Sequence, residues 1–210
     1  GMARQNVENG LSMLHTADSW LQKINDMLSR MHELSVEAGD GTKTTQDITN
    51  IQSEFKELQA EIVRITDSTD SAAKFNGLYL FRGGDGRENV NNDAFGISIQ
   101  IGADLGMKVK IELEQMDTKS TEVLKYVDAS GTSQDVKWAS VIDASTMSVR
   151  SSDSIGKISS AIDHVANSRA TLGAQQSRFG HTMSGLLSYE DNLRKAESKI
   201  RDVDVAKESS

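Results

Sequence analysis

The fold is decided by residues 158–200, which read ISSAIDHVANSRATLGAQQSRFGHTMSGLLSYEDNLRKAESKI. An apolar residue stands at every seventh position of this stretch, without exception. These positions are Ile158, Val165, Leu172, Phe179, Leu186, Leu193 and Ile200. A sustained seven-residue period predicts one long helix, over about 153–207, with a coiled-coil seam along it. The companion seam positions begin apolar at Ile155 and Ile162 but become mostly polar from Arg169 onward, which predicts a narrower stripe in the distal half.

Two more helical stripes lie near the N-terminus. The first has apolar residues three and four apart and predicts a helix over roughly 3–38, with Leu14, Leu21 and Leu28 on its buried face. The second predicts a helix over about 45–69. Its stripe consists of Ile48, Ile51, Phe55, Leu58, Ile62 and Ile65. Gly39-Asp40-Gly41 between the two stripes predicts a turn, so the second helix should fold back antiparallel on the first.

The hydrophobic period changes to two in the middle of the chain. Alternation over 95–101 and 107–113 predicts a β-hairpin, and 78–81 reads as a further strand. Residues 114–150 contain shorter alternating runs at 122–127 and 136–142, on either side of a turn-like segment. We interpret this part as a small β excursion that Trp138 anchors and that the helical bundle does not need for folding.

These patterns predict an α+β chain that is mainly α. We expect an elongated antiparallel helical bundle, or coiled coil, of three long helices, with a β-hairpin region and a small β excursion at one end. Residues 1–113 would form the N-terminal helices and hairpin of a rod-like core, and residues 114–150 the variable excursion. Residues 151–210 would add the long C-terminal helix of the same core.

Composition excludes several functions. A net charge of -8 without a basic stripe argues against nucleic-acid binding, because affinity for phosphates comes from clustered Lys and Arg. The chain has no cysteine, which excludes disulfides, thiol nucleophiles and Cys-ligated zinc. No apolar run approaches the length of a membrane span, so we expect no membrane insertion. Proline is also absent, so nothing in the covalent chain interrupts long helices.

No catalytic, cofactor or metal motif stands out. The four histidines, at 15, 32, 164 and 181, lack the spacing that converges on a metal. The glycine-rich run at 83–86 lacks the Lys-Ser/Thr of a phosphate loop. Asp202 and Asp204 diverge on a helix and cannot act as a carboxylate pair. We therefore expect a protein without cofactor that is not an enzyme.

The two helical ends resemble the bacterial flagellin family. The N-terminal matches are Ile24-Asn25, Leu28, Arg30, Glu33-Leu34, Val36, Gly41-Thr42, Ile51-Gln52, Glu54 and Phe75-Asn76-Gly77. The C-terminal matches are Ala161-Ile162-Asp163, Arg169, Leu172-Gly173-Ala174, Gln176, Arg178-Phe179, Asn192-Leu193, Ala196-Glu197-Ser198 and Ile200-Arg201-Asp202. Each short piece is weak alone, but the ordered pair of blocks is specific. Two alternatives are a hook-filament junction protein and another helical secreted adhesin or secretion-system tip protein.

The resemblance implies a structural subunit of the flagellar filament, secreted through the flagellar export apparatus and assembled with other flagellin subunits outside the cell. It also implies that the extra terminal helices of the family are missing here, so we expect this chain to be monomeric. Arg30, Leu34 and Glu54 match family positions that serve axial subunit packing and, in many flagellins, recognition by an innate immune Toll-like receptor. Read from the residues alone, Arg30 and Glu54 are polar positions off the seam, and Leu34 fits either a surface patch or the core.

Overall fold

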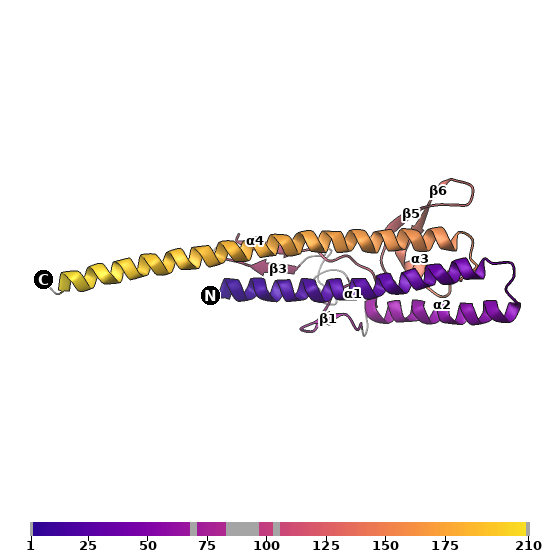
Figure 1. Cartoon of the computed structure of the whole chain (residues 1–210), viewed down its shortest axis with the longest axis horizontal. Helices are drawn as coiled ribbons and strands as arrows, with labels where there is room; N and C mark the ends of the chain where they lie inside the picture. The colour runs from indigo at the N-terminus through magenta and orange to yellow at the C-terminus, as the bar shows by residue number, and fades with distance from the viewer. Residues whose placement is uncertain (1, 68–70, 83–96, 103–105, 209–210) are drawn as a thin grey trace.

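The computed structural model of the chain describes residues 2–67, 71–82, 97–102 and 106–208. Three long helices dominate it: α1 (Met2–Ala38), α2 (Thr45–Thr66) and α4 (Ser154–Glu208). Figure 1 shows α1 lying between α4 and α2, with both of these running antiparallel to it. A fourth, short helix was not expected, and α2 ends earlier than the expected 69, at Thr66, with Asp67 as its C-cap.

The apolar stripe of α1 forms the centre of the rod. Its 37 residues correspond to about 55 Å of helix. Spacing by three and four puts the large side chains on one face, which α4 covers on one side and α2 on the other. The members of the stripe that are at most 1% exposed are Val7, Leu14, Ala17, Leu21, Ile24, Leu28, Met31 and Leu34.

The seven-residue seam of α4 is buried only in its first half. Ile158, Val165, Leu172 and Phe179 are at most 3% exposed, and Leu186 is half-buried at the edge of the cluster. The expected seam residues Leu193 and Ile200 are 51% and 68% exposed, so their assignment to the core is wrong. The reason is visible in Figure 1, where α4 continues past the N-terminal end of α1 and no described element packs on it there.

A polar contact crosses the α1–α4 interface in its middle. Arg169 Nε donates to Asp18 Oδ1 at 2.8 Å, between positions 151 residues apart, and the same guanidinium also donates to Gln22 Oε1. Sequence analysis placed Arg169 on the companion seam, and both Arg169 and Asp18 are about one-third exposed. The pair therefore lies at the edge of the apolar seam, where it fixes the register of the two helices.

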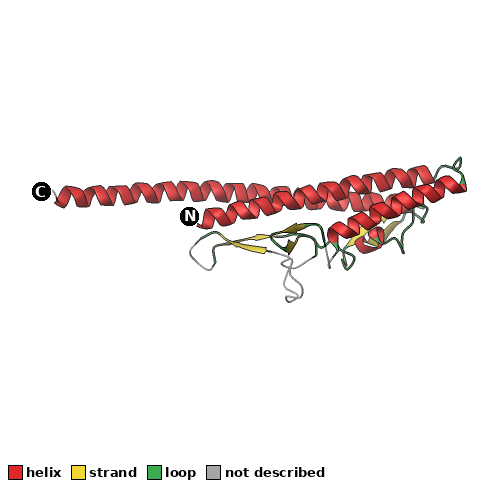
Figure 2. Ribbon diagram, turned by 90° about the horizontal axis from the view of Figure 1, so that it is seen from below, coloured by secondary structure: helices red, strands yellow, loops and turns green. Residues whose placement is uncertain are grey.

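The strands form three separate antiparallel pairs in the described residues, drawn as yellow arrows in Figure 2. They are β1 (Lys74–Phe75) with β2 (Leu78–Tyr79), β3 (Ile97–Gln100) with β4 (Lys108–Ile111), and β5 (Val123–Val127) with β6 (Ser133–Lys137). The predicted hairpin is confirmed with Ile97 opposite Ile111, although position 95 lies outside the described residues. The expected strand at 78–81 is only two residues long.

The β3–β4 hairpin is held between α1 and α4 by side-chain amides. Asn6 Nδ2 of α1 donates to the carbonyl of Gln100 at 3.0 Å. Gln175 of α4 accepts from the amide of Glu112 at 3.0 Å and donates to its carbonyl at 2.9 Å. These bonds satisfy backbone groups that a two-stranded sheet leaves open at its edge.

The second half of the expected 136–142 strand is instead a short helix, α3 (Trp138–Ile142). Trp138, Val141 and Ile142 are all at most 1% exposed, and their spacing of three and four puts them on one helical face. Burial of that face against the rod overrides the local alternation. The predicted run at 136–142 therefore overlaps β6 only at 136–137 and is wrong for α3.

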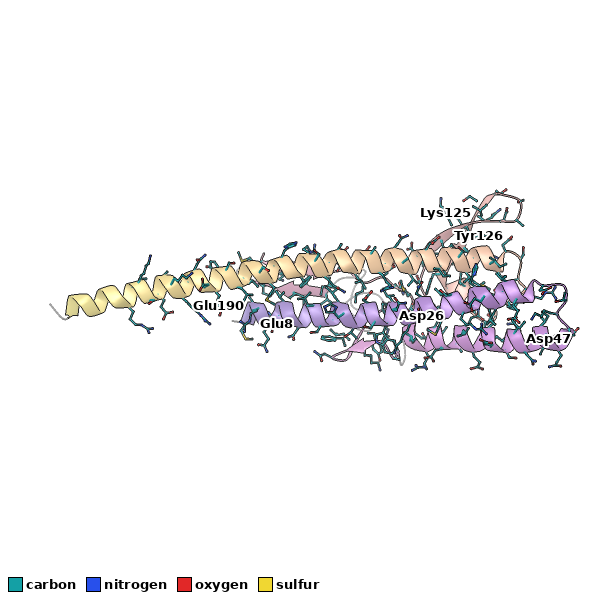
Figure 3. The ribbon with its side chains drawn as sticks, viewed as in Figure 1. Glu8, Asp26, Asp47, Lys125, Tyr126 and Glu190 are labelled. Carbon is teal, nitrogen blue, oxygen red and sulfur yellow. The ribbon has the colours of Figure 1, made fainter. Side chains whose placement is uncertain are left out.

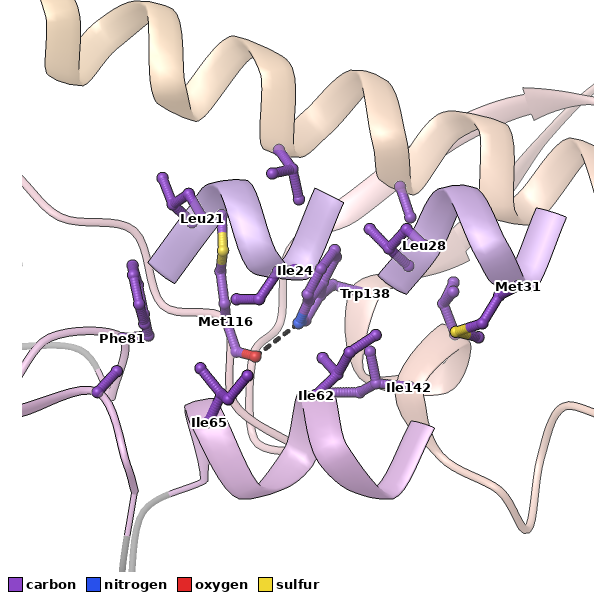
Figure 4. Packing of buried hydrophobic residues seen from close by; sticks show 14 of the residues in the cluster. Leu21, Ile24, Leu28, Met31, Ile62, Ile65, Phe81, Met116, Trp138 and Ile142 are labelled. Atoms are coloured by element: carbon purple, nitrogen blue, oxygen red, sulfur yellow. Dashed lines mark hydrogen bonds between the residues drawn. The ribbon is translucent and has the colours of Figure 1, made fainter. Parts of the chain in front are cut away.

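The excursion shares the core of the rod, which contradicts the expectation that the bundle is independent of it. Figure 4 shows the Trp138 ring and Ile142 packed between α1, through Leu28, and α2, through Ile62. The indole Nε1 donates to the carbonyl of Met116 at 2.7 Å, so its polar edge is satisfied. Residues 116–149 thus contribute to the same buried cluster as the three long helices.

A buried amide of α2 fixes the position of α3. Gln59 is 0% exposed, and its Nε2 donates to the carbonyls of Val141 at 2.9 Å and Met147 at 3.3 Å. Both carbonyls belong to the end of α3 and the loop that follows. The last carbonyls of a helix have no amide of the same helix to bond, and the Gln59 side chain supplies a donor for one of them, that of Val141.

Candidate subunit-packing surface

The α1–α2 turn fixes which surface residues of the two helices meet. Thr44 is the N-cap of α2: its Oγ1 accepts from the amide of Asp47 at 3.2 Å, and Asp47 Oδ2 accepts from the amide of Thr44 at 3.0 Å. This reciprocal capping box stands at the far end of the rod, where Figure 3 labels Asp47. Lys43 Nζ contacts Glu37 Oε1 at 2.6 Å across the turn. The start of α2, and with it the register of its outer face, is therefore well defined.

Three charged side chains meet where the exposed faces of α1 and α2 adjoin, and we call them the Arg30 cluster. They are Arg30 and Glu33 of α1 and Glu54 of α2. Arg30 Nε donates to Glu54 Oε1 of α2 at 2.6 Å, and its Nη1 donates to Glu33 Oε2 at 3.1 Å. The three side chains are 45%, 67% and 46% exposed, in that order. The predicted neighbourhood of Arg30 and Glu54 is thus present, and it is a direct ion pair between two helices.

The hydrogen bonds within this cluster shift the pKa values of Arg30 and Glu54. The bond from Arg30 lowers the pKa of the Glu54 carboxyl below its usual range. The bonds to Glu54 and then Glu33 raise the pKa of the Arg30 guanidinium. Both shifts favour the charged forms of Arg30 and Glu54. Exposed ion pairs of this kind contribute little to folding stability.

Leu34 does not belong to this surface. It is 0% exposed and lies in the core cluster, in the same stripe as Leu28 and Met31. Of the two readings left open for Leu34, the core holds and the surface patch does not. Asp26, four residues before Arg30 on α1, accepts from Gln22 Nε2 at 2.7 Å.

The predicted core residues of α2 behave as expected. Phe55 and Ile62 are fully buried, Ile51 is 8% exposed, and Leu58 is half-buried against the cluster. The buried residues that sequence reasoning missed on this helix are polar, Gln59 and Thr66. Thr66 Oγ1 donates to the carbonyl of Ile62 within the helix at 2.9 Å, whereas Gln59 bonds outside it. The one sign of the burial of Gln59 in the sequence is its place beside Leu58, at the edge of the apolar stripe. A polar side chain buried there needs hydrogen-bond partners from elsewhere in the chain.

A second surface feature is an open cleft of 380 Å³ between residues 110–122 and α4. His164 lies at its edge, with Nε2 at 3.4 Å from Glu114 Oε2 and its ring 5.6 Å from that of Trp138. Among the residues that the structure describes, no three metal-ligating side chains converge, and no helix is long and apolar enough to cross a membrane. The run at 83–86 lies outside the described residues.

Comparison with known sequences matches both ends of the chain to one family. Residues 1–85 match the bacterial flagellin N-terminal helical region, and residues 155–210 match the bacterial flagellin C-terminal helical region. Flagellin FlaB2 of Treponema pallidum is 34% identical over 98% of this chain and 67% of its own length. Sequence similarity therefore extends through the central strands as well as the helical ends.

Solved structures show the same fold. The flagellin of Bacillus cereus superposes with a TM-score of 0.61 at 23% identity, covering 92% of this chain and 94% of that one. A putative flagellar hook-associated protein from Vibrio parahaemolyticus gives 0.67 at 12% identity, over 94% and 89%. At such identities the likeness concerns the fold alone, and the sequence relatives decide between the two kinds of protein. The chain belongs to the bacterial flagellin family and is a structural subunit of the flagellar filament, not an enzyme.

Proposed function

We propose that the Arg30 cluster is a contact surface of this filament subunit, used for packing against a neighbouring subunit and for binding by the innate immune Toll-like receptor for flagellin. The observation that carries the proposal is an exposed guanidinium held by carboxylates from two helices. Arginine has five N–H donors, and the two described bonds leave several of them directed at solvent. These donors suit a carboxylate on a partner surface.

Preorganisation supports this role. A long arginine side chain ordinarily loses rotamer freedom when it binds, and Glu33 and Glu54 already restrict Arg30 in the free subunit. Arginine is also among the residues that most often dominate binding energy at protein interfaces. Because Leu34 is buried, the surface is polar, and affinity would depend on Arg30 more than on an apolar centre.

The test compares Arg30→Ala with Arg64→Ala. Arg64 is a matched control because it is 57% exposed and its ion pair, with Glu61, lies within α2 instead of joining α2 to α1. We expect Arg30→Ala to reduce receptor signalling by the purified chain by about tenfold or more, at unchanged stability of the subunit. In filaments that bacteria assemble with the same substitution, we expect a lower melting temperature. Arg64→Ala should leave all three unchanged. Equal effects of the two variants, or none from Arg30→Ala, would refute the role of the cluster.

We further propose that the bacterium secretes this subunit through the flagellar export apparatus and that the purified 210-residue chain is monomeric. The family supports export, because a filament outside the cell is built from subunits made inside. The exposed polar faces of α1 and α2 support the monomer, since isolated surface ion pairs give weak association. Light scattering at high concentration should give the mass of one chain, and a discrete oligomer would contradict the second proposal.

We also propose that α1 and α4 form a coiled coil over the segment where they overlap. Support comes from the seven-residue positions of α4, which are buried from Ile158 to Phe179 against the stripe of α1. Leu186 is the last residue of the α4 seam that packs against the core. The coiled coil that we propose therefore ends there, and the seven-residue pattern continues in a part of α4 that α1 does not reach.

A further inference from the structure

The chain contains two Asn-Gly dipeptides in contrasting surroundings. Asn9-Gly10 lies in the second turn of α1, where Gly10 is buried against the Phe179 ring of α4. Asn76-Gly77 forms the two-residue connection between β1 and β2, and both of its residues are exposed. The two sites therefore share their local chemistry and differ only in structure.

The connection between β1 and β2 has the geometry of a type I′ turn. Asn76 has φ 49° and Gly77 has φ 80°, and positive values at both central residues define that turn. An added Cβ on Gly77 would meet nothing within 4 Å, so the turn stands free in solvent. The ladder next to the turn has two residue pairs, Lys74 with Tyr79 and Phe75 with Leu78, and the Leu80 amide continues it with a bond to the Ala73 carbonyl. Such a short ladder opens at little cost.

We propose that Asn76 is a site of spontaneous deamidation in the folded subunit. In this reaction the backbone nitrogen of Gly77 gives its proton to a base in solvent and attacks Cγ of Asn76. The new N–Cγ bond closes a five-membered succinimide, and the Cγ–NH2 bond breaks as ammonia leaves with a proton from water. Water then opens either carbonyl of the ring and produces aspartate or isoaspartate. The net reaction consumes one water and releases one ammonia.

The lack of a side chain at Gly77 makes the attack possible. A Cβ on the following residue would crowd the approach of its nitrogen to Cγ, and the structure shows open space on this side. No hydrogen bond from the Asn76 side chain to a described residue holds its amide away from Gly77. Each opening of the two-residue ladder frees the backbone to reach the ring-closing geometry.

Asn9 is protected although its sequence context is the same. The amide of Gly10 is inside a continuous helix, where it points along the axis toward the carbonyl four residues earlier and cannot turn to the Asn9 side chain. A Cβ on Gly10 would be 2.8 Å from Phe179 Cε1, which shows how closely α4 covers this position. Reaction at Asn9 requires α1 to leave α4 locally.

Conversion of Asn76 would change the charge and the backbone of the hairpin. A new carboxylate would enter a hairpin whose Tyr79 ring has two cations over it, with Lys74 Nζ and Arg82 Cζ each 4.8 Å from the ring centre. Isoaspartate also lengthens the backbone by one carbon, which breaks the pairing of Phe75 with Leu78. The next residue after β2, Leu80, donates to the carbonyl of Ala73 at 3.0 Å and is buried, so the change reaches the edge of the core.

The experiment follows both sites by peptide mapping with mass spectrometry that separates aspartate from isoaspartate. The purified chain is incubated at mildly alkaline pH, folded or in denaturant. In the folded chain we expect Asn76 to convert at least about tenfold faster than Asn9, because Asn9 needs local unfolding first. In denaturant the two rates should become similar, since both sites then share an Asn-Gly sequence without structure.

Two variants complete the test. Asn76→Gln should stop conversion at position 76 and leave Asn9 unchanged, because glutamine closes a six-membered ring slowly. Asn76→Asp places the aspartate product in the turn directly, so circular dichroism of this variant shows whether the fold tolerates it. Equal rates at Asn9 and Asn76 in the folded chain would overturn the proposal. So would an Asn76 that converts in denaturant but not in the folded chain.

Discussion

Gly10 of α1 lies directly against the ring of Phe179 of α4, in the part of the rod that approaches the end of their overlap. A Cβ at position 10 would be 2.8 Å from Phe179 Cε1 and 3.5 Å from Ile111 Cδ1. Phe179 is fully buried, so its ring has no free space into which it could move. The absence of a side chain at residue 10 sets the distance between the helices.

The first prediction is that Gly10→Ala destabilises the chain. Alanine favours the helix by roughly 1 kcal/mol, but overpacking against Phe179 should cost about 1–3 kcal/mol. Gly173→Ala is the matched control, because it lies in α4 with nothing within 4 Å of the added Cβ. That variant should gain about 0.5–1 kcal/mol. Urea denaturation measures both, and a stabilising Gly10→Ala would show that the helices separate easily.

The second prediction separates the buried half of the α4 seam from the exposed half. Leu172→Ala should lower the free energy of unfolding by about 2–5 kcal/mol, because Leu172 is 3% exposed in the core. Leu193→Ala removes the same atoms from the same seven-residue series, but Leu193 is 51% exposed. Its effect should stay within about 0.5 kcal/mol. Similar denaturation midpoints for the two variants would mean that α4 is covered over its whole length.

The third prediction concerns Trp138. Trp138→Ala should cost about 3–5 kcal/mol, because the ring fills the space between α1 and α2 and also loses its bond to Met116. Val127→Ala in the same excursion is the control, since Val127 is 63% exposed. Deleting residues 118–148 should unfold the bundle. A stable, cooperative deletion variant in thermal unfolding would restore the view that the excursion is dispensable.

The fourth prediction uses the buried carboxyl of Asp117. Asp117 is 1% exposed; its Oδ1 accepts from Gln115 Nε2 and the amide of Lys119, and its Oδ2 has no hydrogen-bond partner among the described residues. Burial raises the pKa of this carboxyl above its usual 3.8. The folded state therefore holds the proton more tightly than the unfolded one, and stability declines as pH rises from the usual pKa through the raised one.

Asp117→Asn removes this penalty. At neutral pH the variant should be more stable than the parent chain by about 1 kcal/mol, because a neutral amide replaces a buried charge. The difference should vanish in acid, below the usual pKa, where the parent carboxyl is protonated in both states. Urea titrations at the two pH values measure this. An equal difference at both would show that packing, not charge, distinguishes the two side chains.

The long helices were predictable because their patterns repeat over many turns. Stripes of three-and-four and seven-residue spacing fixed α1, α2 and α4 to within a few residues. Leu34 could also have been placed correctly, since it continues the spacing of Leu28 and Met31. The companion seam positions of α4 turn polar from Arg169 onward, which signals a narrower stripe, but the seven-residue positions stay apolar as far as Ile200. Leu193 and Ile200 were therefore assigned to a core that stops before them.

The errors in the excursion arise from contacts between distant parts of the chain. The five residues of α3 are too few to establish a period, and their helical form depends on burial against α1 and α2. Gln59 lies 82 positions before its partner Val141. The Arg30 cluster was more accessible to sequence reasoning, because it needs only two adjacent helices and one short turn.

The bond between Arg169 and Asp18, 151 positions apart, has a consequence for the order of folding. α1 and α2 are neighbours in sequence, so their pairing closes a short loop and can form early. The α1–α4 seam must instead close a loop of almost the whole chain, at a higher entropic cost. During synthesis, half of the apolar stripe on α1 therefore stays uncovered until residues 158–179 have left the ribosome. The rate-limiting step of folding should lie in the last part of the chain to be made.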